Sequence, residues 1–109
     1  MERARQVEVF SALASETRLR LLDILDEKEL SCEDPDRCSP EELGCNGEEL
    51  VDQLGITAPS VSNHLKELRR AGLIESEKRG RKVYCYLNRN TMKQLSSYFD
   101  QRANVASNR

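Results

Sequence analysis

The stretch Gly55–Ile74 reads GITAPSVSNHLKELRRAGLI and holds the start, body and end of one helix, followed by a strand. Thr57 is a residue type that caps helix starts, and Pro59 falls in the first turn, where its missing N–H loses no hydrogen bond. Gly72 predicts the end of the helix. An aliphatic stripe at helical spacing predicts its buried face: Val61, Leu65 and Leu68. One face of this helix therefore belongs to a core, and small polar residues occupy the other.

The residues on either side of this helix predict a second helix and a hairpin. Glu48–Leu54 reads as a short helix that Gly55 stops. Downstream, Leu73–Lys78 reads as a strand, Arg79–Arg81 as a turn, and Lys82–Leu87 as a returning strand with alternating apolar residues. A tight turn between two helices, followed by a hairpin, predicts a helix-turn-helix with a wing.

Three further helices complete the predicted domain. Apolar residues at helical spacing predict one from Arg3 to Ala14, one that Ser15 caps and that ends near Glu27 or Lys28, and one from Thr91 to Gln101. The fold class is therefore mainly α with a small β-hairpin (α+β), a winged helix-turn-helix. We expect one domain over residues 1–101, with a cysteine-containing acidic insertion at about 31–47 and a flexible tail at 102–109.

The net charge of −2 conceals a division along the chain. Between Thr57 and Lys93 there are nine basic and three acidic residues, whereas between Glu16 and Asp52 there are thirteen acidic and four basic residues. A phosphate backbone responds to the local patch rather than to the overall charge. The basic half therefore favours a nucleic-acid partner.

The composition also indicates where the protein acts. No apolar run approaches the roughly 18 residues that span a bilayer, so we expect no membrane partner and a cytoplasmic location with reduced cysteines. The sequence has no phosphate-binding glycine loop and no nucleophile motif, and it contains one histidine. We therefore expect a protein that is not an enzyme.

Three segments together resemble the ArsR/SmtB family of metal- and stress-responsive repressors: LASETRLRLL at 13–22, VSNHLKEL at 61–68 with AGLI at 71–74, and RGRKVY at 79–84. The resemblance extends from about Val7 to Phe99. It implies a homodimer, formed through the first and last helices, that represses transcription. The matching interface positions are Val7, Phe10, Leu95, Tyr98 and Phe99.

A twofold dimer of this kind predicts a palindromic, double-stranded operator. Side chains near the start of a reading helix reach base edges, while the turn and the wing contact phosphates or the minor groove. Asn63 is suited to bidentate contact with adenine. The expected DNA contacts are Thr57, Pro59, Ser60, Ser62, Asn63, His64, Lys66, Arg69, Arg79, Arg81 and Lys82.

The insertion holds Cys32, Cys38 and Cys45 in a C-x5-C-x6-C arrangement. Three thiolates suit arsenite, antimonite or mercury, whereas zinc or cadmium needs a fourth ligand. We expect a thiophilic metal or metalloid effector, and no cofactor for DNA binding itself. That the effector relieves repression is what the family resemblance implies. The alternatives are a reversible disulfide that senses an oxidant, and a winged-helix module with a structural zinc.

Two further features bear on these cysteines. The acidic residues around the three thiols disfavour a fast peroxide sensor, because negative charge lowers the thiolate fraction. Cys85, in the middle of the returning strand, has the position of a buried apolar residue.

Overall fold

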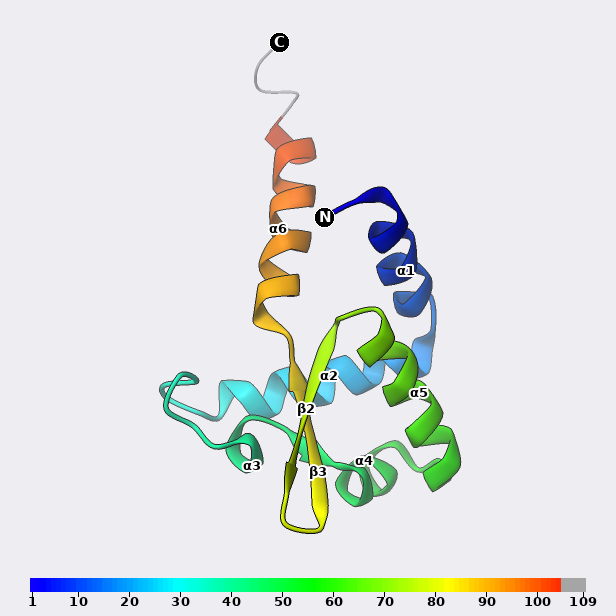
Figure 1. Cartoon of the computed structure of the whole chain (residues 1–109), viewed down its shortest axis with the longest axis vertical. Helices are drawn as coiled ribbons and strands as arrows, with labels where there is room; N and C mark the ends of the chain where they lie inside the picture. Colours follow the sequence, from blue (N-terminus) through cyan, green and yellow to red (C-terminus); the bar gives the residue numbers. More distant parts are fainter. Residues whose placement is uncertain (105–109) are drawn as a thin grey trace.

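The computed structural model describes residues 1–104, which form six helices and three strands (Figure 1). The helices are α1 (Arg3–Leu13), α2 (Glu16–Leu30), α3 (Pro40–Leu43), α4 (Gly47–Leu54), α5 (Ala58–Arg70) and α6 (Arg89–Asn104). The strands are β1 (Cys45–Asn46), β2 (Ile74–Arg79) and β3 (Lys82–Leu87). The predicted winged helix-turn-helix is confirmed, with β2 and β3 as the wing.

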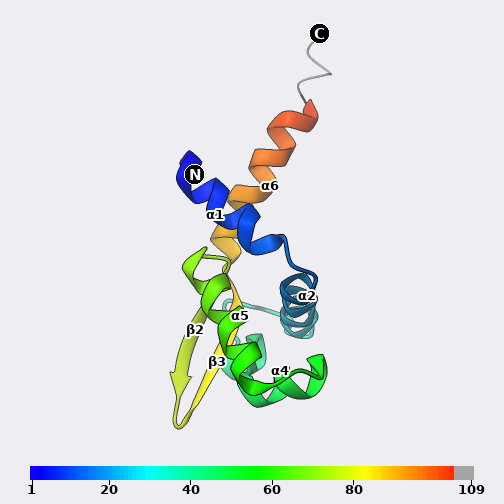
Figure 2. The ribbon, with the colours of Figure 1, turned by 90° about the vertical axis from the view of Figure 1, so that its right-hand side faces the viewer.

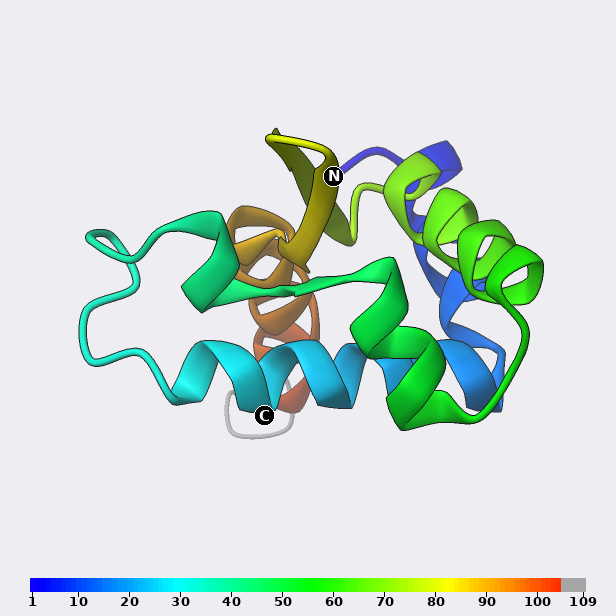
Figure 3. The ribbon, with the colours of Figure 1, turned by 90° about the horizontal axis from the view of Figure 1, so that it is seen from below.

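Helices α1 and α6 project from one side of α2, and the wing projects from the other (Figure 1). In Figure 1, α2 crosses the middle of the molecule, α1 and α6 rise from it, and the β2–β3 hairpin extends the other way. Figure 2 shows α5 and α4 packed beside α2, on the side where the wing projects. From below, in Figure 3, α4 and α5 lie toward one end of α2, and the segment before α3 lies at its other end.

Local sequence signals place α4 and α5. Gly55 has a left-handed backbone (φ 68°) and ends α4, as its position after the helical pattern predicted. The Thr57 hydroxyl accepts a hydrogen bond from the Ser60 N–H at 3.3 Å and caps α5. The strand β2 begins at Ile74, one residue later than expected, because the Leu73 N–H donates to the Leu68 carbonyl at 3.0 Å and completes the end of α5.

The core lies between α2, α4, α5 and the start of the wing. Its largest fully buried side chains include leucines from the three helices and the leucine just before β2: Leu21, Leu25, Leu50, Leu68 and Leu73. The predicted inner face of α5 is confirmed, because Val61, Leu65 and Leu68 are all buried. This packing holds α5 by one face and leaves its other face at the surface.

A short third strand was absent from the sequence prediction. Cys45 and Asn46 pair antiparallel with β3, opposite Cys85 and Tyr84, and extend the sheet to the order β1–β3–β2. Gly44 makes this pairing possible, because a Cβ atom there would overlap the Cys85 carbonyl group. The expected irregular loop thus ends in ordered structure.

Two helices are longer than expected. Helix α2 continues to Leu30, beyond Lys28, and the Ser31 hydroxyl donates to the Lys28 carbonyl at its end. Helix α6 continues past Gln101 through Arg102–Asn104, part of the expected flexible tail. The Arg102 guanidinium donates to the Tyr98 carbonyl and stacks 3.5 Å from the Tyr98 ring centroid. The rest of that tail, residues 105–109, lies outside the described residues.

Within residues 1–104, none of the helices combines the length and the apolar character that crossing a bilayer requires.

Candidate nucleic-acid interface

The exposed face of α5 carries the residues predicted to read bases. Ser62 and Asn63 are exposed, and Ser60 and His64 are half-buried on the same helix. All lie in its first two turns, where α-helical side chains reach base edges in a major groove. The structure therefore presents donors and acceptors on a helix that its opposite face fixes in the core.

The wing supplies cations beside this helix. Its turn has a left-handed backbone at Gly80 (φ 64°), and the two residues that follow, Arg81 and Lys82, are exposed with no ion-pair partner within residues 1–104. Arg79 differs from the other two, because its Nε lies 3.1 Å from the Glu41 carboxylate of α3. Arg81 and Lys82 are thus, like Lys78 of β2, exposed wing cations without an ion-pair partner among the described residues.

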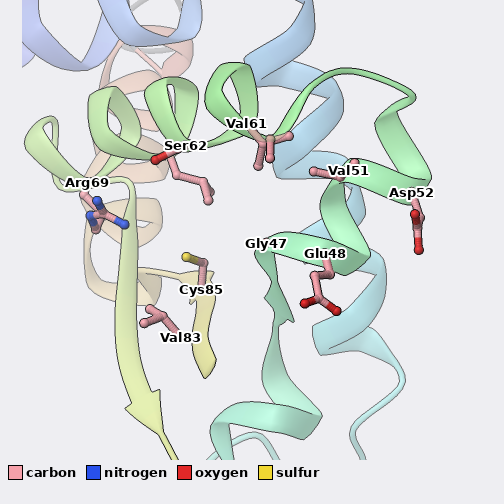
Figure 4. A pocket seen from close by; sticks show the side chains of 11 residues that line it. Gly47, Glu48, Val51, Asp52, Val61, Ser62, Arg69, Val83 and Cys85 are labelled. Carbon is pink, nitrogen blue, oxygen red and sulfur yellow. The ribbon is translucent and has the colours of Figure 1, made fainter. Parts of the chain in front are cut away.

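A cleft of about 670 Å³ separates α5 from the wing and α4. Leu65 and Val83 contribute apolar walls from α5 and β3. In Figure 4, the Arg69 side chain of α5 and the Cys85 side chain of β3 point into the space between these elements. Burial raises the pKa of the Cys85 thiol, and the positive charge of the Arg69 guanidinium offsets part of that rise. Arg69 therefore lies at the rim of the cleft, between the reading helix and the wing.

The expected dimer positions gather on α1 and α6. The Phe10 ring lies 5.6 Å from the Tyr98 ring and 5.9 Å from the Phe99 ring, measured between centroids. Phe99 is 55% exposed and Val7 is 60% exposed, whereas Leu95 packs against the core. These residues form an aromatic surface that a single chain leaves partly open to water.

The predicted three-thiolate site does not form. Cys32 and Cys38 are joined by a disulfide, whereas Cys45 is a buried free thiol in β1. Within residues 1–104 there is no cluster of three His, Cys, Asp or Glu side chains that suits a metal ion. The prediction is wrong in its geometry because the β1–β3 pairing draws Cys45 into the sheet, away from the other two cysteines.

Cys45 and Cys85 are opposite each other in the sheet and both are buried, as expected for Cys85. Burial, reinforced by the Glu49 carboxylate, raises the pKa of the Cys45 thiol to about 11. Both thiols are therefore poorly placed to act as nucleophiles in the folded protein.

These differences predict selective alkylation. After reduction, native protein at pH 8 should gain two carbamidomethyl groups per chain from iodoacetamide, on Cys32 and Cys38, with release of iodide. Cys45 is buried, and only about one-thousandth of it is thiolate at that pH, so it should react only after the protein is denatured. Intact mass measured over time checks this, and a Cys32→Ser/Cys38→Ser variant serves as control. More than two rapid additions to the native chain would contradict it.

Ion pairs that the sequence did not reveal connect the disulfide segment to α6. The Arg89 guanidinium, at the first residue of α6, lies 3.1 Å from the Asp36 carboxylate and 3.5 Å from the Glu29 carboxylate of α2. The pKa of Glu29 is raised because its desolvation outweighs the attraction of Arg89. These two ion pairs link the segment between Cys32 and Cys38, and helix α2, to the start of α6.

Comparisons with known proteins agree with this geometry. Residues 45–76 match the family model described as "Bacterial regulatory protein, arsR family". The chain is 35% identical over 89 residues to the HTH-type transcriptional regulator KmtR of Mycobacterium tuberculosis, which covers 82% of this chain and 57% of KmtR. The chain thus spans little more than half the length of that relative.

Two further relatives cover more of their own length. The uncharacterized HTH-type transcriptional regulator YbzH of Bacillus subtilis is 33% identical over 72% of this chain and 78% of YbzH. The solution structure of the homodimeric winged helix-turn-helix domain of Mb0332 from Mycobacterium bovis, a possible ArsR-family regulator, has a TM-score of 0.66 at 21% identity. It covers 93% of this chain and 80% of that one. These relatives are regulators rather than enzymes, and this chain belongs to the ArsR family of DNA-binding winged helix-turn-helix transcriptional regulators.

Proposed function

We propose that this protein is a homodimeric repressor that binds a palindromic operator through α5 and the wing, and that thiol chemistry at Cys32 and Cys38 controls binding. The observation that carries the DNA-binding part is the exposed polar start of α5, separated by one cleft from the free wing cations Arg81 and Lys82. Residues 1–101 serve in this proposal as one DNA-binding and dimerisation domain.

Each side chain on this surface has a role that its chemistry suggests. Asn63 pairs with an adenine edge, and the hydroxyls of Ser60 and Ser62 adapt to several bases. Thr57 and Pro59 place the start of α5 against the DNA backbone. The cations Lys66, Arg69, Arg81 and Lys82 contact phosphates or enter the minor groove, and Arg79 joins them when it leaves Glu41.

The aromatic surface of α1 and α6 supports the dimer, as does the homodimeric state of the Mb0332 domain. A Phe99→Glu variant should be monomeric at micromolar concentration, because the carboxylate would be buried unpaired against a second copy. Sedimentation velocity measures the change, with Leu30→Glu as a control at an exposed leucine of α2, which is not one of the two interface helices. A wild-type monomer, or a dimer unaffected by Phe99→Glu, would contradict the proposed interface.

The thiol part of the proposal rests on the Cys32–Cys38 pair and on Arg89. When the two thiols are oxidised, two electrons and two protons pass to an acceptor, such as a small-molecule disulfide, and the S–S bond closes the segment. Asp36 lies inside this closed segment and pairs with Arg89 of α6. Opening or closing the segment would thus reposition α6 and, through the dimer, the spacing of the two α5 helices.

A trivalent metalloid is the second candidate effector, because the reduced pair offers two thiols within one short segment. The metalloid would act on the same two cysteines as the oxidant. One binding experiment that compares the oxidised, reduced and metalloid-treated protein therefore separates the two effectors.

The test is fluorescence anisotropy on the DNA upstream of the protein's own gene, at fixed salt, with oxidised protein, reduced protein, and reduced protein plus arsenite. We expect at least a tenfold difference in affinity between two of these states, lost in a Cys32→Ser/Cys38→Ser variant and kept in Cys45→Ala. Equal affinity in all three states would refute thiol control and leave the DNA-binding proposal intact.

A further inference from the structure

Arg18 joins three elements around the reading helix. Its backbone N–H donates to the Ser15 hydroxyl, which caps α2. Its side chain reaches away from α2, with Nε donating to the Ala12 carbonyl near the end of α1 and Nη1 lying 3.4 Å from Nδ1 of His64 on α5. The position three residues after a helix cap often holds a glutamate that completes a capping box, and here an arginine occupies it.

The contact between Arg18 and His64 fixes which histidine nitrogen carries the proton. A guanidinium has N–H donors and no acceptor. His64 Nδ1 must therefore accept, which requires a neutral ring with its proton on Nε2. Within residues 1–104, Nε2 has no hydrogen-bond partner. A half-buried side chain on the reading helix thus keeps one unused donor.

We infer that Arg18 is a positioning residue that holds His64 as the Nε2–H tautomer and aims this donor at an acceptor on DNA. The acceptor is a phosphate oxygen or a base-edge oxygen or nitrogen. This inference rests on the proposed reading of DNA by α5. The inference also explains why an arginine suits this position at the start of α2, because a capping-box glutamate could not donate a hydrogen bond to the imidazole.

The tautomer is measurable without DNA because His64 is the only histidine in the chain. Two-bond ¹H–¹⁵N spectra at pH 8.5, where an ordinary imidazole is neutral, should show one set of well-separated ring nitrogens with the proton on Nε2. In Arg18→Leu the two nitrogen shifts should move toward each other as the tautomers exchange. The control Arg20→Leu changes an exposed arginine of the same helix and should leave the spectrum as in wild type. A proton on Nδ1, or no response to Arg18→Leu, would overturn the inference.

DNA binding tests the consequence. Arg18→Leu and His64→Ala should each weaken binding roughly tenfold, and the double variant should be little worse than either, because Arg18 acts through His64. His64→Gln, which places an amide N–H near the Nε2 position, should recover part of the affinity, whereas His64→Asn should not. Additive losses in the double variant, or equal losses for Gln and Asn, would contradict the positioning role.

Two DNA probes identify the acceptor. If His64 contacts phosphate, His64→Ala should weaken binding to operator and to random duplex by the same factor. If it contacts a base, the loss should be confined to the operator. If no variant of α5, including Asn63→Ala, affects binding, the proposed reading of DNA by α5 is rejected. The NMR measurement tests the role of Arg18 independently of that result.

Discussion

A Gly44→Ala variant should lose about 3 kcal/mol or more of unfolding free energy, enough to leave a domain of this size marginally folded. The added Cβ atom would overlap the carbonyl carbon and oxygen of Cys85, which are backbone atoms of the central strand β3. The clash is relieved only if β1 separates from β3. Cys45 and Asn46 would then lose their buried positions.

Gly47→Ala is the matched control for this prediction. A Cβ atom at Gly47 has no neighbour within 4 Å, and the residue begins helix α4. Alanine should therefore be neutral there or stabilise by up to about 1 kcal/mol. Urea unfolding followed by circular dichroism compares the two variants. Equal stability of Gly44→Ala and wild type would show that β1 does not pair as described.

The combined Asn63→Ala/Arg81→Ala variant should bind operator DNA at least about 100-fold more weakly than wild type. Loss of a bidentate base contact costs about 1–3 kcal/mol, and loss of an arginine contact in the wing removes a charge at the phosphate backbone. In a dimer both losses occur twice. Asn63 and Arg81 are exposed, so neither replacement should change the fold.

Fluorescence anisotropy at several salt concentrations checks this prediction. The Arg81 change should flatten the dependence of affinity on salt, because fewer counterions are released, while Asn63→Ala alone should relax sequence preference. Arg20→Ala, which removes an exposed arginine from α2, controls for net charge and should bind as wild type does. Wild-type affinity in the double variant would show that the DNA-binding surface lies elsewhere on the protein.

The sequence predicted those parts of the fold whose signals are local. The cap at Thr57, the left-handed glycine at Gly55 and the helical spacing of Val61, Leu65 and Leu68 each act within a few residues. They sufficed to place α4 and α5, and the alternation in Lys82–Leu87 sufficed for the second strand of the wing. The exposed DNA-facing residues follow from the same periodicity, since the buried stripe defines the opposite face.

Local sequence patterns could not predict contacts between segments that are far apart in the chain. Cys45 looked like the third member of a cysteine cluster because only its spacing was visible, and its partner across the sheet is forty residues away. The Arg79–Glu41 and Arg18–His64 contacts likewise join separate elements. A two-residue strand such as β1 has no periodicity to detect, so only tertiary packing determines it.

Hydroxyl-radical footprinting on the upstream DNA tests the central claim, that a dimer of this chain reads a palindrome with two α5 helices. The account predicts two protected regions, related by twofold symmetry and centred about one helical turn or a multiple of it apart. Both should disappear together in Asn63→Ala/Arg81→Ala. A single unpaired protected region, or uniform protection along the duplex, would contradict it.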